Sequence, residues 1–220
     1  MDNEQKALAF LGASAGISAV TTIPDKGRND LAFLFAHLGF TQGAEIGTEA
    51  GKYAFILCSY IPRLHLSCID PWFDYDDGGG YKDSVDQERF DAYYGEARKR
   101  LAPFDVSFYR FFSSDAVKQF SDNSLDFVYI DGNHRLDYVC QDIINWTEKV
   151  KPGGIIAGHD YIKQRHQHSS HIPYALEAYR KAYRIPRMYV LDNKDKSKRS
   201  VDENKEYDRI RSWFFVKGVQ

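Results

Sequence analysis

Short apolar runs alternate with longer amphipathic stretches along most of this 220-residue chain. Runs this short suit buried strands, whereas apolar residues at helical spacing, such as Leu31, Leu34 and Phe35, indicate a helix that packs on a sheet. We predict strands at residues 64–70, 105–109, 125–130, 155–158, 188–191 and 212–216, after a first strand that ends near Ile46. We predict helices at residues 28–38, 52–60, 83–101, 136–150 and 173–183. The alternation predicts an α/β domain with a mostly parallel sheet.

Polar and acidic residues follow the predicted strands. Asp70 ends the second strand, Ser113, Ser114 and Asp115 follow the third, Asp131 and His134 follow the fourth, and His159 and Asp160 follow the fifth. The carboxyl ends of parallel strands meet at one edge of a sheet, and ligands bind in the crevice there. The sequence therefore predicts a ligand site at this edge.

The first strand runs into an acidic-x-Gly-x-x-x-Gly turn formed by Glu45, Gly47 and Gly51. Glycines let backbone amides approach a ligand closely, although an ordinary strand-to-helix turn has the same composition. The acid before the glycines suits a ligand ammonium or hydroxyl and would repel a pyrophosphate. Asp70 follows about twenty residues later, where nucleotide-binding folds place an acid on the ribose hydroxyls.

Three further motifs complete the pattern: Ile-Asp-Gly-Asn-His at residues 130–134, Pro-Gly-Gly at 152–154 and His-Asp at 159–160. With these motifs the chain resembles class I S-adenosylmethionine-dependent methyltransferases, in particular a bacterial branch of small-molecule and sugar O-methyltransferases. The resemblance covers roughly residues 40–160. It implies a Rossmann-like α/β sandwich with a seven-stranded, mostly parallel sheet and an antiparallel last strand. We expect a single domain, with a catalytic core at 39–220 and a helical extension or lid at 1–38.

The resemblance implies a cofactor site for S-adenosyl-L-methionine. Its expected contacts, from the methionine end to the adenine, are Glu45, Gly47, Gly51, Asp131, Asp70, Ser113, Ser114 and Asp115. Trp72 stands in an aromatic and glycine-rich loop at 71–81 and either stacks on the adenine or anchors the loop in the core.

Asp131 either contacts the cofactor, binds a metal or acts as the base. Related O-methyltransferases hold Mg²⁺ through an acid at this position and an acid–acid or acid–amide pair after the fifth strand. Here that pair is His159 and Asp160, so the predicted metal ligands are Asp131, His159 and Asp160, and the imidazole favours Zn²⁺ or Mn²⁺ over Mg²⁺. The catalytic candidates are Asp131, His134 and Asp160, with His134 as the alternative base or a helix cap. The histidines at 166, 168 and 171 are expected in a polar loop without a metal.

The overall composition limits the kinds of partner and the cellular compartment that we expect. The formal net charge of −2 gives no sign of a nucleic-acid surface. The three cysteines, Cys58, Cys68 and Cys140, lie in apolar contexts and suit reduced thiols in the cytoplasm. Residues 7–23 carry no charge, but no positive start precedes them, and they are short for a membrane span. We expect them to form a lid or an oligomer contact.

The sequence thus predicts methylation of a small hydroxylated acceptor, such as a sugar or glycan-like metabolite. We expect a small-molecule partner and neither nucleic acid nor membrane, and leave open whether the chain forms a homo-oligomer. The alternatives are an NAD(P)-dependent oxidoreductase, which the missing Gly-x-Gly-x-x-Gly spacing disfavours, and a non-catalytic nucleoside-binding protein of the same fold.

Overall fold

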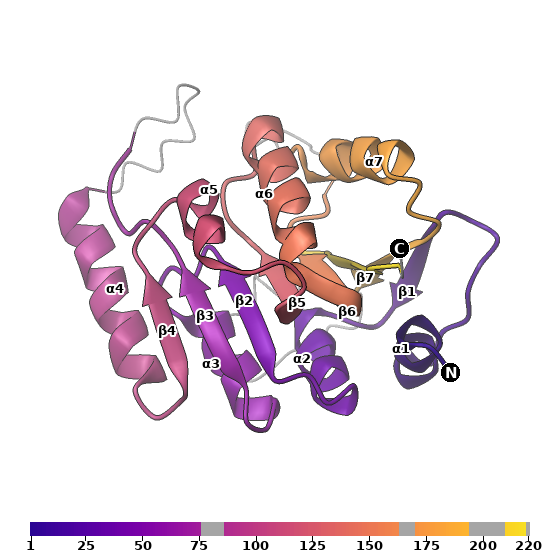
Figure 1. Ribbon diagram of the computed structural model, residues 1–220, viewed down its shortest axis with the longest axis horizontal. Coiled ribbons are helices and arrows are strands. Elements are labelled where there is room, and N and C mark those ends of the chain that lie inside the picture. The colour runs from indigo at the N-terminus through magenta and orange to yellow at the C-terminus, as the bar shows by residue number, and fades with distance from the viewer. Residues whose placement is uncertain (76–85, 163–169, 194–209, 219–220) are drawn as a thin grey trace.

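The computed structural model describes residues 1–75, 86–162, 170–193 and 210–218, and an eight-stranded sheet forms its centre. The strands are β1 (Val20–Pro24), β2 (Gln42–Ile46), β3 (His65–Ile69), β4 (Val106–Tyr109), β5 (Leu125–Ile130), β6 (Val150–Gly158), β7 (Met188–Asp192) and β8 (Ser212–Val216). Their order is β1-β7-β8-β6-β5-β2-β3-β4 (Figure 1). Only β8 runs antiparallel, between β6 and β7. The predicted Rossmann-like fold with an antiparallel last strand is confirmed.

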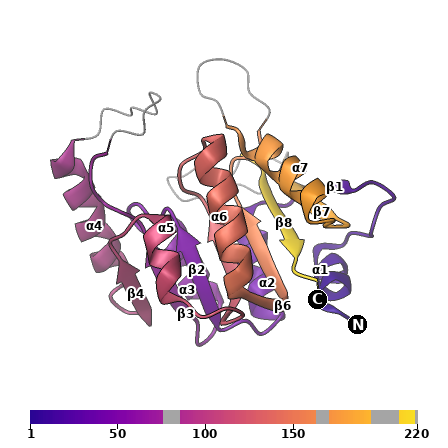
Figure 2. The same ribbon diagram turned by 45° about the horizontal axis from the view of Figure 1, so that its top comes forward.

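Helices cover both faces of the sheet and bury a separate apolar core on each side (Figures 1 and 2). One layer contains α1 (Asn3–Leu11), α2 (Arg28–His37), α3 (Lys52–Tyr60) and α4 (Gln87–Leu101). The other contains α5 (Ser113–Ala116), the 3₁₀ turn η1 (Val117–Gln119), α6 (Leu136–Lys149) and α7 (Ile172–Ala182). The central strands β2 and β5 are buried on both faces, which explains the nearly continuous apolar run of β5.

The first 24 residues correct the seven-strand prediction. β1 adds an eighth strand, because the short run Val-Thr-Thr-Ile-Pro pairs in parallel with β7. Without β1, the hydrogen-bonding edge of β7 would be open. α1 buries Ala7, Leu8 and Leu11 in the core, and Glu4 pairs with Arg187. α1 and β1 pack against the body of the fold, and residues 1–24 do not line the cavity described below. The lid and the oligomer contact stay predictions.

Three sequence features lie wholly or mainly outside the described residues: the glycine-rich part of the loop at 76–81, His166 with His168, and the charge run from 194 to 208. None of the described helices is both long enough and apolar enough to cross a membrane.

Candidate active site

The register of the sheet brings the ends of four parallel strands together. Ile46 of β2 pairs with Ile69 of β3 on one side and with Ile130 of β5 on the other, and Ile130 pairs with Gly158 of β6. The next residue in each strand therefore emerges at one edge, as the sequence predicted. A cavity of about 1060 Å³ opens there. Of the predicted site residues, Gly47, Asp70, Trp72, Ser113, Ser114, Asp131, His134 and Asp160 line it, whereas Glu45, Gly51, Asp115 and His159 do not.

Asp70 is held rigidly at the end of β3. Its Oδ2 accepts a hydrogen bond from the amide of Glu49 at 2.9 Å, and its Oδ1 accepts one from the amide of Trp72 at 2.8 Å. Burial raises the pKa of this carboxyl to about 6. Both oxygens keep lone pairs for a ligand hydroxyl, since a carboxylate has about four acceptor positions.

The two glycines of the turn serve the protein's own packing. Gly47 has φ +87°, and a Cβ there would lie 2.1 Å from the carbonyl oxygen of Asp131. Gly51 has φ +72° and begins α3, and a Cβ there would meet Ala97 and Leu101 of α4 at 3.2–3.3 Å. Gly51 does not line the cavity, and its contact with the cofactor stays a prediction.

The Glu45 side chain does not line the cavity. It leaves β2 on the same face as its register partners Cys68 and Tyr129, and the residue is 2% exposed. Burial raises its pKa to about 8. Its Oε2 has no hydrogen-bond partner among the described residues. Strand alternation points this side chain into the core, and its contact with the methionine end of the cofactor stays a prediction.

Trp72 and Asp115 differ in their surroundings. The Trp72 ring is buried, donates its Nε1–H to the carbonyl of Glu49 at 2.8 Å and packs against Tyr94, an arrangement that favours the core anchor of the two predicted roles. Asp115 accepts a bond from Lys118 at 2.7 Å, faces solvent and does not line the cavity. The adenine contacts of both residues stay predictions.

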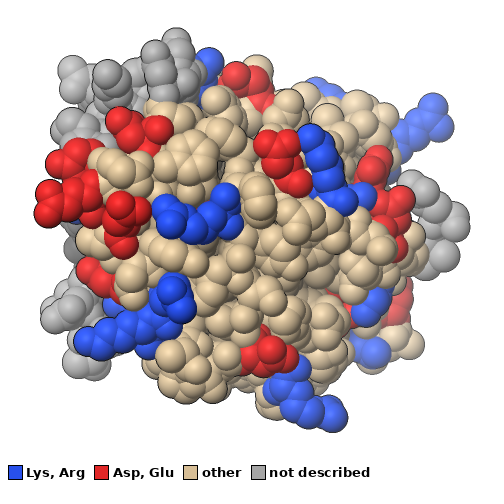
Figure 3. Space-filling model, turned by 60° about the vertical axis from the view of Figure 1, so that its left-hand side comes forward, with Lys and Arg blue, Asp and Glu red and all other residues tan. Residues whose placement is uncertain are grey.

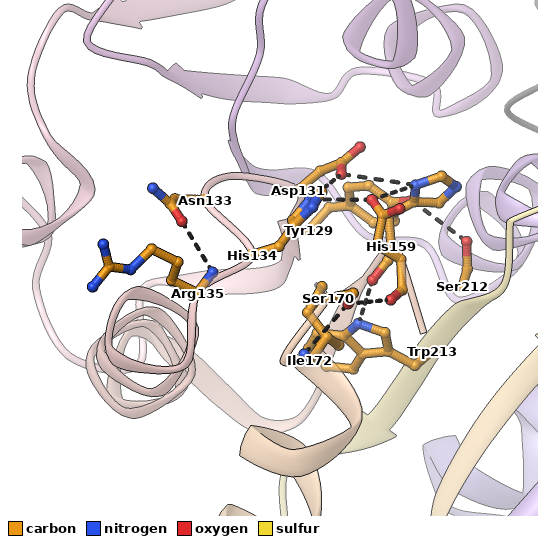
Figure 4. A network of polar contacts seen from close by, with 11 residues as sticks. Tyr129, Asp131, Asn133, His134, Arg135, His159, Ser170, Ile172, Ser212 and Trp213 are labelled. Carbon is orange, nitrogen blue, oxygen red and sulfur yellow. Dashed lines mark hydrogen bonds and ion pairs between the residues drawn. The ribbon is translucent and has the colours of Figure 1, made fainter. Parts of the chain in front are cut away.

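Asp131, His134 and Asp160 converge at the ends of β5 and β6 (Figure 4). The His134 Nε2 lies 3.1 Å from Asp160 Oδ2 and 3.8 Å from Asp131 Oδ1. Burial lowers the pKa of His134, but its bonds to the two carboxylates outweigh burial and raise it to about 10. The pKa of Asp160 falls far below its usual range, because the contacts with His134 and His159 outweigh burial. This arrangement holds an imidazolium between two carboxylates.

His159 is buried beside the same two carboxylates. Its Nδ1 lies 3.1 Å from Asp160 Oδ2 and 3.8 Å from Asp131 Oδ1, but the residue is 1% exposed and does not line the cavity. The ligand atoms of Asp131, His134 and Asp160 all lie within 4.8 Å of one another, so His134 is a further candidate ligand. The predicted metal role of His159 stays a prediction.

The start of α7 supports this cluster from below. Ser170 donates its hydroxyl to the Asp160 carbonyl at 2.7 Å, and the amide of His171 donates to the carbonyl of His134 at 3.0 Å. The Nδ1 of His171 accepts the amide of Leu136 at 3.0 Å. His171 thus has a structural role at the start of α6.

One buried acid in the cavity wall, Asp142, was not predicted. It lies on the buried stripe of α6 with Val139, Ile143 and Trp146, and its carboxylate accepts the Ser113 hydroxyl at 2.5 Å. A carboxylate within an apolar helical stripe is visible in the sequence, so Asp142 could have been identified there as a candidate site residue.

On the face seen in Figure 3, basic and acidic side chains are interspersed around a broad uncharged area.

The comparisons agree with this geometry. A family model described as a methyltransferase domain matches residues 44–161, which is more than half of the chain. The chain belongs to this methyltransferase family. Among curated proteins, no relative matches the chain. The matched residues run from β2 to just after β6 and contain every strand end that lines the cavity.

Solved structures share the methyltransferase fold at low sequence identity. The O-methyltransferase TomG from Streptomyces achromogenes, involved in tomaymycin synthesis and solved with SAM, is 14% identical with a TM-score of 0.57, over 87% of this chain and 80% of its own. An O-methyltransferase from Bacillus cereus in complex with SAH is 14% identical with a TM-score of 0.57, over 86% and 80%. The N-methyltransferase NodS from Bradyrhizobium japonicum WM9 is 14% identical with a TM-score of 0.52, over 87% and 95%. The fold is therefore shared by enzymes that methylate different atoms.

Proposed function

We propose that this methyltransferase transfers a methyl group from S-adenosyl-L-methionine to a hydroxyl of a small acceptor, such as a sugar or glycan-like metabolite. The observation that carries the proposal is one cavity that joins a ribose-type acid, Asp70, to a proton-handling group, Asp131, His134 and Asp160. Its volume, about 1060 Å³, lies just above the usual range for small-molecule sites, about 300–1,000 Å³. That leaves room for a nucleoside cofactor and a small acceptor together. The SAM and SAH in the TomG and Bacillus cereus structures support the choice of cofactor.

Methyl transfer needs the acceptor oxygen in line with the sulfonium and needs a group that takes the acceptor's proton. Asp131 and Asp160 are the available carboxylates at this end of the cavity. His134 carries a proton below a pH of about 10 in the arrangement observed, so it acts as a base only after losing that proton. Asp131 therefore remains a candidate base beside His134.

The same three side chains fit a divalent ion. Two carboxylates and one imidazole, with ligand atoms within 4.8 Å of one another, are a donor set that suits Mn²⁺, Fe²⁺ or Zn²⁺ at least as well as Mg²⁺. An ion there would act as a Lewis acid that lowers the pKa of the acceptor hydroxyl. Asp131, His134 and Asp160 would hold it, and His159 would orient Asp160 from behind.

Calorimetry tests the cofactor. We expect S-adenosylhomocysteine to bind with a Kd of about 1 μM, or roughly −8 kcal/mol, and NAD not to bind measurably. Asp70→Asn should weaken binding by about 1–3 kcal/mol, as expected when ligand hydroxyls lose a charged acceptor. Asp74→Asn, at a neighbouring acid of the cavity wall, is the matched control and should bind as the unaltered protein does. Unchanged affinity in Asp70→Asn would refute the assignment of Asp70 to the ribose. Tight binding of NAD without binding of S-adenosylhomocysteine would replace the proposal with the oxidoreductase alternative.

Metal dependence is tested separately. Asp160→Ala should lower methyl transfer by orders of magnitude and leave S-adenosylhomocysteine affinity nearly intact, because Asp160 lies at the acceptor end. EDTA should mimic this variant, and Mn²⁺ should restore activity at least as well as Mg²⁺. Full activity in EDTA would contradict the metal dependence, and Asp131 or His134 would then take the acceptor's proton without help from a metal.

A further inference from the structure

A row of aromatic side chains lies on the outer surface of α1, α2 and α3, which follow one another along the lower part of Figure 1. The Phe10 ring of α1 stacks on the His37 ring of α2, with the two centroids 4.8 Å apart. The Phe33 ring of α2 lies 4.5 Å from the Tyr60 ring of α3, and Phe55 continues the row on α3. All five residues are exposed to solvent, and we call them the aromatic face.

The helices that carry the aromatic face expose almost no charge. Among their exposed residues, Lys6 and Lys52 are the only ones of the types Lys, Arg, Asp and Glu. Both lie near the ends of the row, Lys6 one turn before Phe10 and Lys52 three residues before Phe55. α4 belongs to the same layer and has the composition of a helix that faces water. Its exposed charged residues are Glu88, Arg89, Asp91, Glu96, Arg98 and Lys99.

The size of the aromatic face is that of a functional surface. Its four phenyl and phenol rings are 38–49% exposed, which corresponds to roughly 300–400 Å² for side chains of about 150–250 Å² each. The largest apolar patch on a typical monomer covers about 300–600 Å² and is often functional.

A stable interface needs about 800 Å² from each partner, so the rings supply its centre and neighbouring residues must supply the rest. Residues 12–19, which follow α1 directly, carry no charge, and the Ile17 side chain among them is fully exposed. Ala9 and Ser59 are further uncharged residues exposed beside the rings. The uncharged surface therefore extends beyond the aromatic face.

The distribution of charge indicates the kind of partner. A two-fold axis places the same residues opposite one another, so charges at the centre of such a contact would repel their own copies. The aromatic face has its two lysines near its ends, where the rim of an interface stays in contact with water. An oppositely charged protein would find little to pair with here, and anionic membranes attract clusters of about four to eight Lys or Arg residues. A second copy of the chain fits this surface best.

We propose that the aromatic face is the contact between two copies of this chain, related by a two-fold axis. Burial of the rings removes apolar surface from water on both copies, which is the main driving force of association. No exposed residue of α1, α2 or α3 lines the cavity at the strand ends, so the contact leaves that cavity open. The proposal does not depend on which reaction takes place there.

Sedimentation equilibrium of the full-length protein tests the contact. We expect twice the 25.3 kDa mass of one chain at concentrations up to about 100 μM, since interfaces of standard size have Kd values from about μM to pM. Phe33→Glu should weaken the association at least about 100-fold, because both copies bring the new charge to the same apolar contact. Ile144→Glu makes the same change at a residue of α6 that is 39% exposed in the other layer, and this control should associate as the unaltered protein does.

Each outcome supports or overturns the proposal. The mass of a single chain at every concentration would overturn it. Association that persists in Phe33→Glu, or that Ile144→Glu weakens equally, would place the contact elsewhere and also overturn it. Circular dichroism checks that each variant is folded. Should Phe33→Glu fail to fold, Phe10→Lys changes a different helix of the aromatic face and is measured in its place, with the same expected loss.

Discussion

Replacing Gly47 by alanine tests how closely β2 and β5 approach at the cavity edge. An L-residue at φ +87° costs about 1–2 kcal/mol, because its Cβ crowds the neighbouring carbonyl. The new Cβ would also lie 2.1 Å from the backbone oxygen of Asp131. Backbone cannot swing aside as a side chain can, so a further cost of about 1–3 kcal/mol follows from the forced shift. We expect Gly47→Ala to lower the free energy of unfolding by roughly 2–5 kcal/mol.

Gly39→Ala is the matched control for this measurement. Gly39 has φ +72°, but a Cβ there would meet nothing within 4 Å, so only the conformational cost of about 1–2 kcal/mol applies. Urea unfolding can be followed by the fluorescence of the three tryptophans, all of which are buried. Equal losses in the two variants would refute the argument, because the contact with Asp131 would then contribute nothing. Gly47→Ala should also weaken the binding of S-adenosylhomocysteine, because the forced shift displaces Asp131.

Four further substitutions test the packing of the fold. Trp72→Phe keeps most of the ring volume but leaves the carbonyl of Glu49 without its donor. Urea unfolding should therefore show a loss of about 1–3 kcal/mol in the free energy of unfolding, with little change in ligand affinity. A large loss of affinity without a loss of stability would instead support the stacking role. Burial holds the pKa of Glu45 at about 8 against an ordinary 4.5, so the folded state keeps a proton that the unfolded state has lost between these values. The free energy of unfolding should therefore fall as pH rises from about 4.5 to 8. Glu45→Gln should make this fall shallower, while the raised pKa values of Asp70, about 6, and Asp142, about 7, maintain part of it; identical pH profiles would contradict the buried position of Glu45. Asp126 accepts hydrogen bonds from the backbone amides of Thr41 and Gln42 at the start of β2, so Asp126→Ala should lower the free energy of unfolding by about 2–4 kcal/mol. Lys151→Met removes only the ion pair with Asp126 and should lower it by less than about 1 kcal/mol in the same assay.

The sequence alone was sufficient for the element order and for the edge of the sheet that carries the site. Parallel strands that are buried on both faces need continuous apolar runs, so β2, β3 and β5 are visible in the pattern. The residue that follows each run must emerge at the carboxyl end, which places Asp70, Asp131 and Asp160 at one edge without any knowledge of packing. The short β1 escaped prediction because its polar threonines show no core pattern and its pairing with β7 joins residues far apart in the chain.

The tertiary structure decided which of these residues line the cavity. Glu45 and His159 each stand beside a cavity-lining position in the sequence, yet each one packs against protein, because the direction of a side chain depends on strand alternation and on the neighbouring helix. Asp142 is the reverse case: a residue of the buried helical stripe lines the cavity, where Ser113, 29 positions away, donates to its carboxylate. The order of helices and strands along the chain follows from local hydrophobicity, whereas the order of strands in the sheet and the facing of a side chain follow from contacts between segments that are distant in sequence.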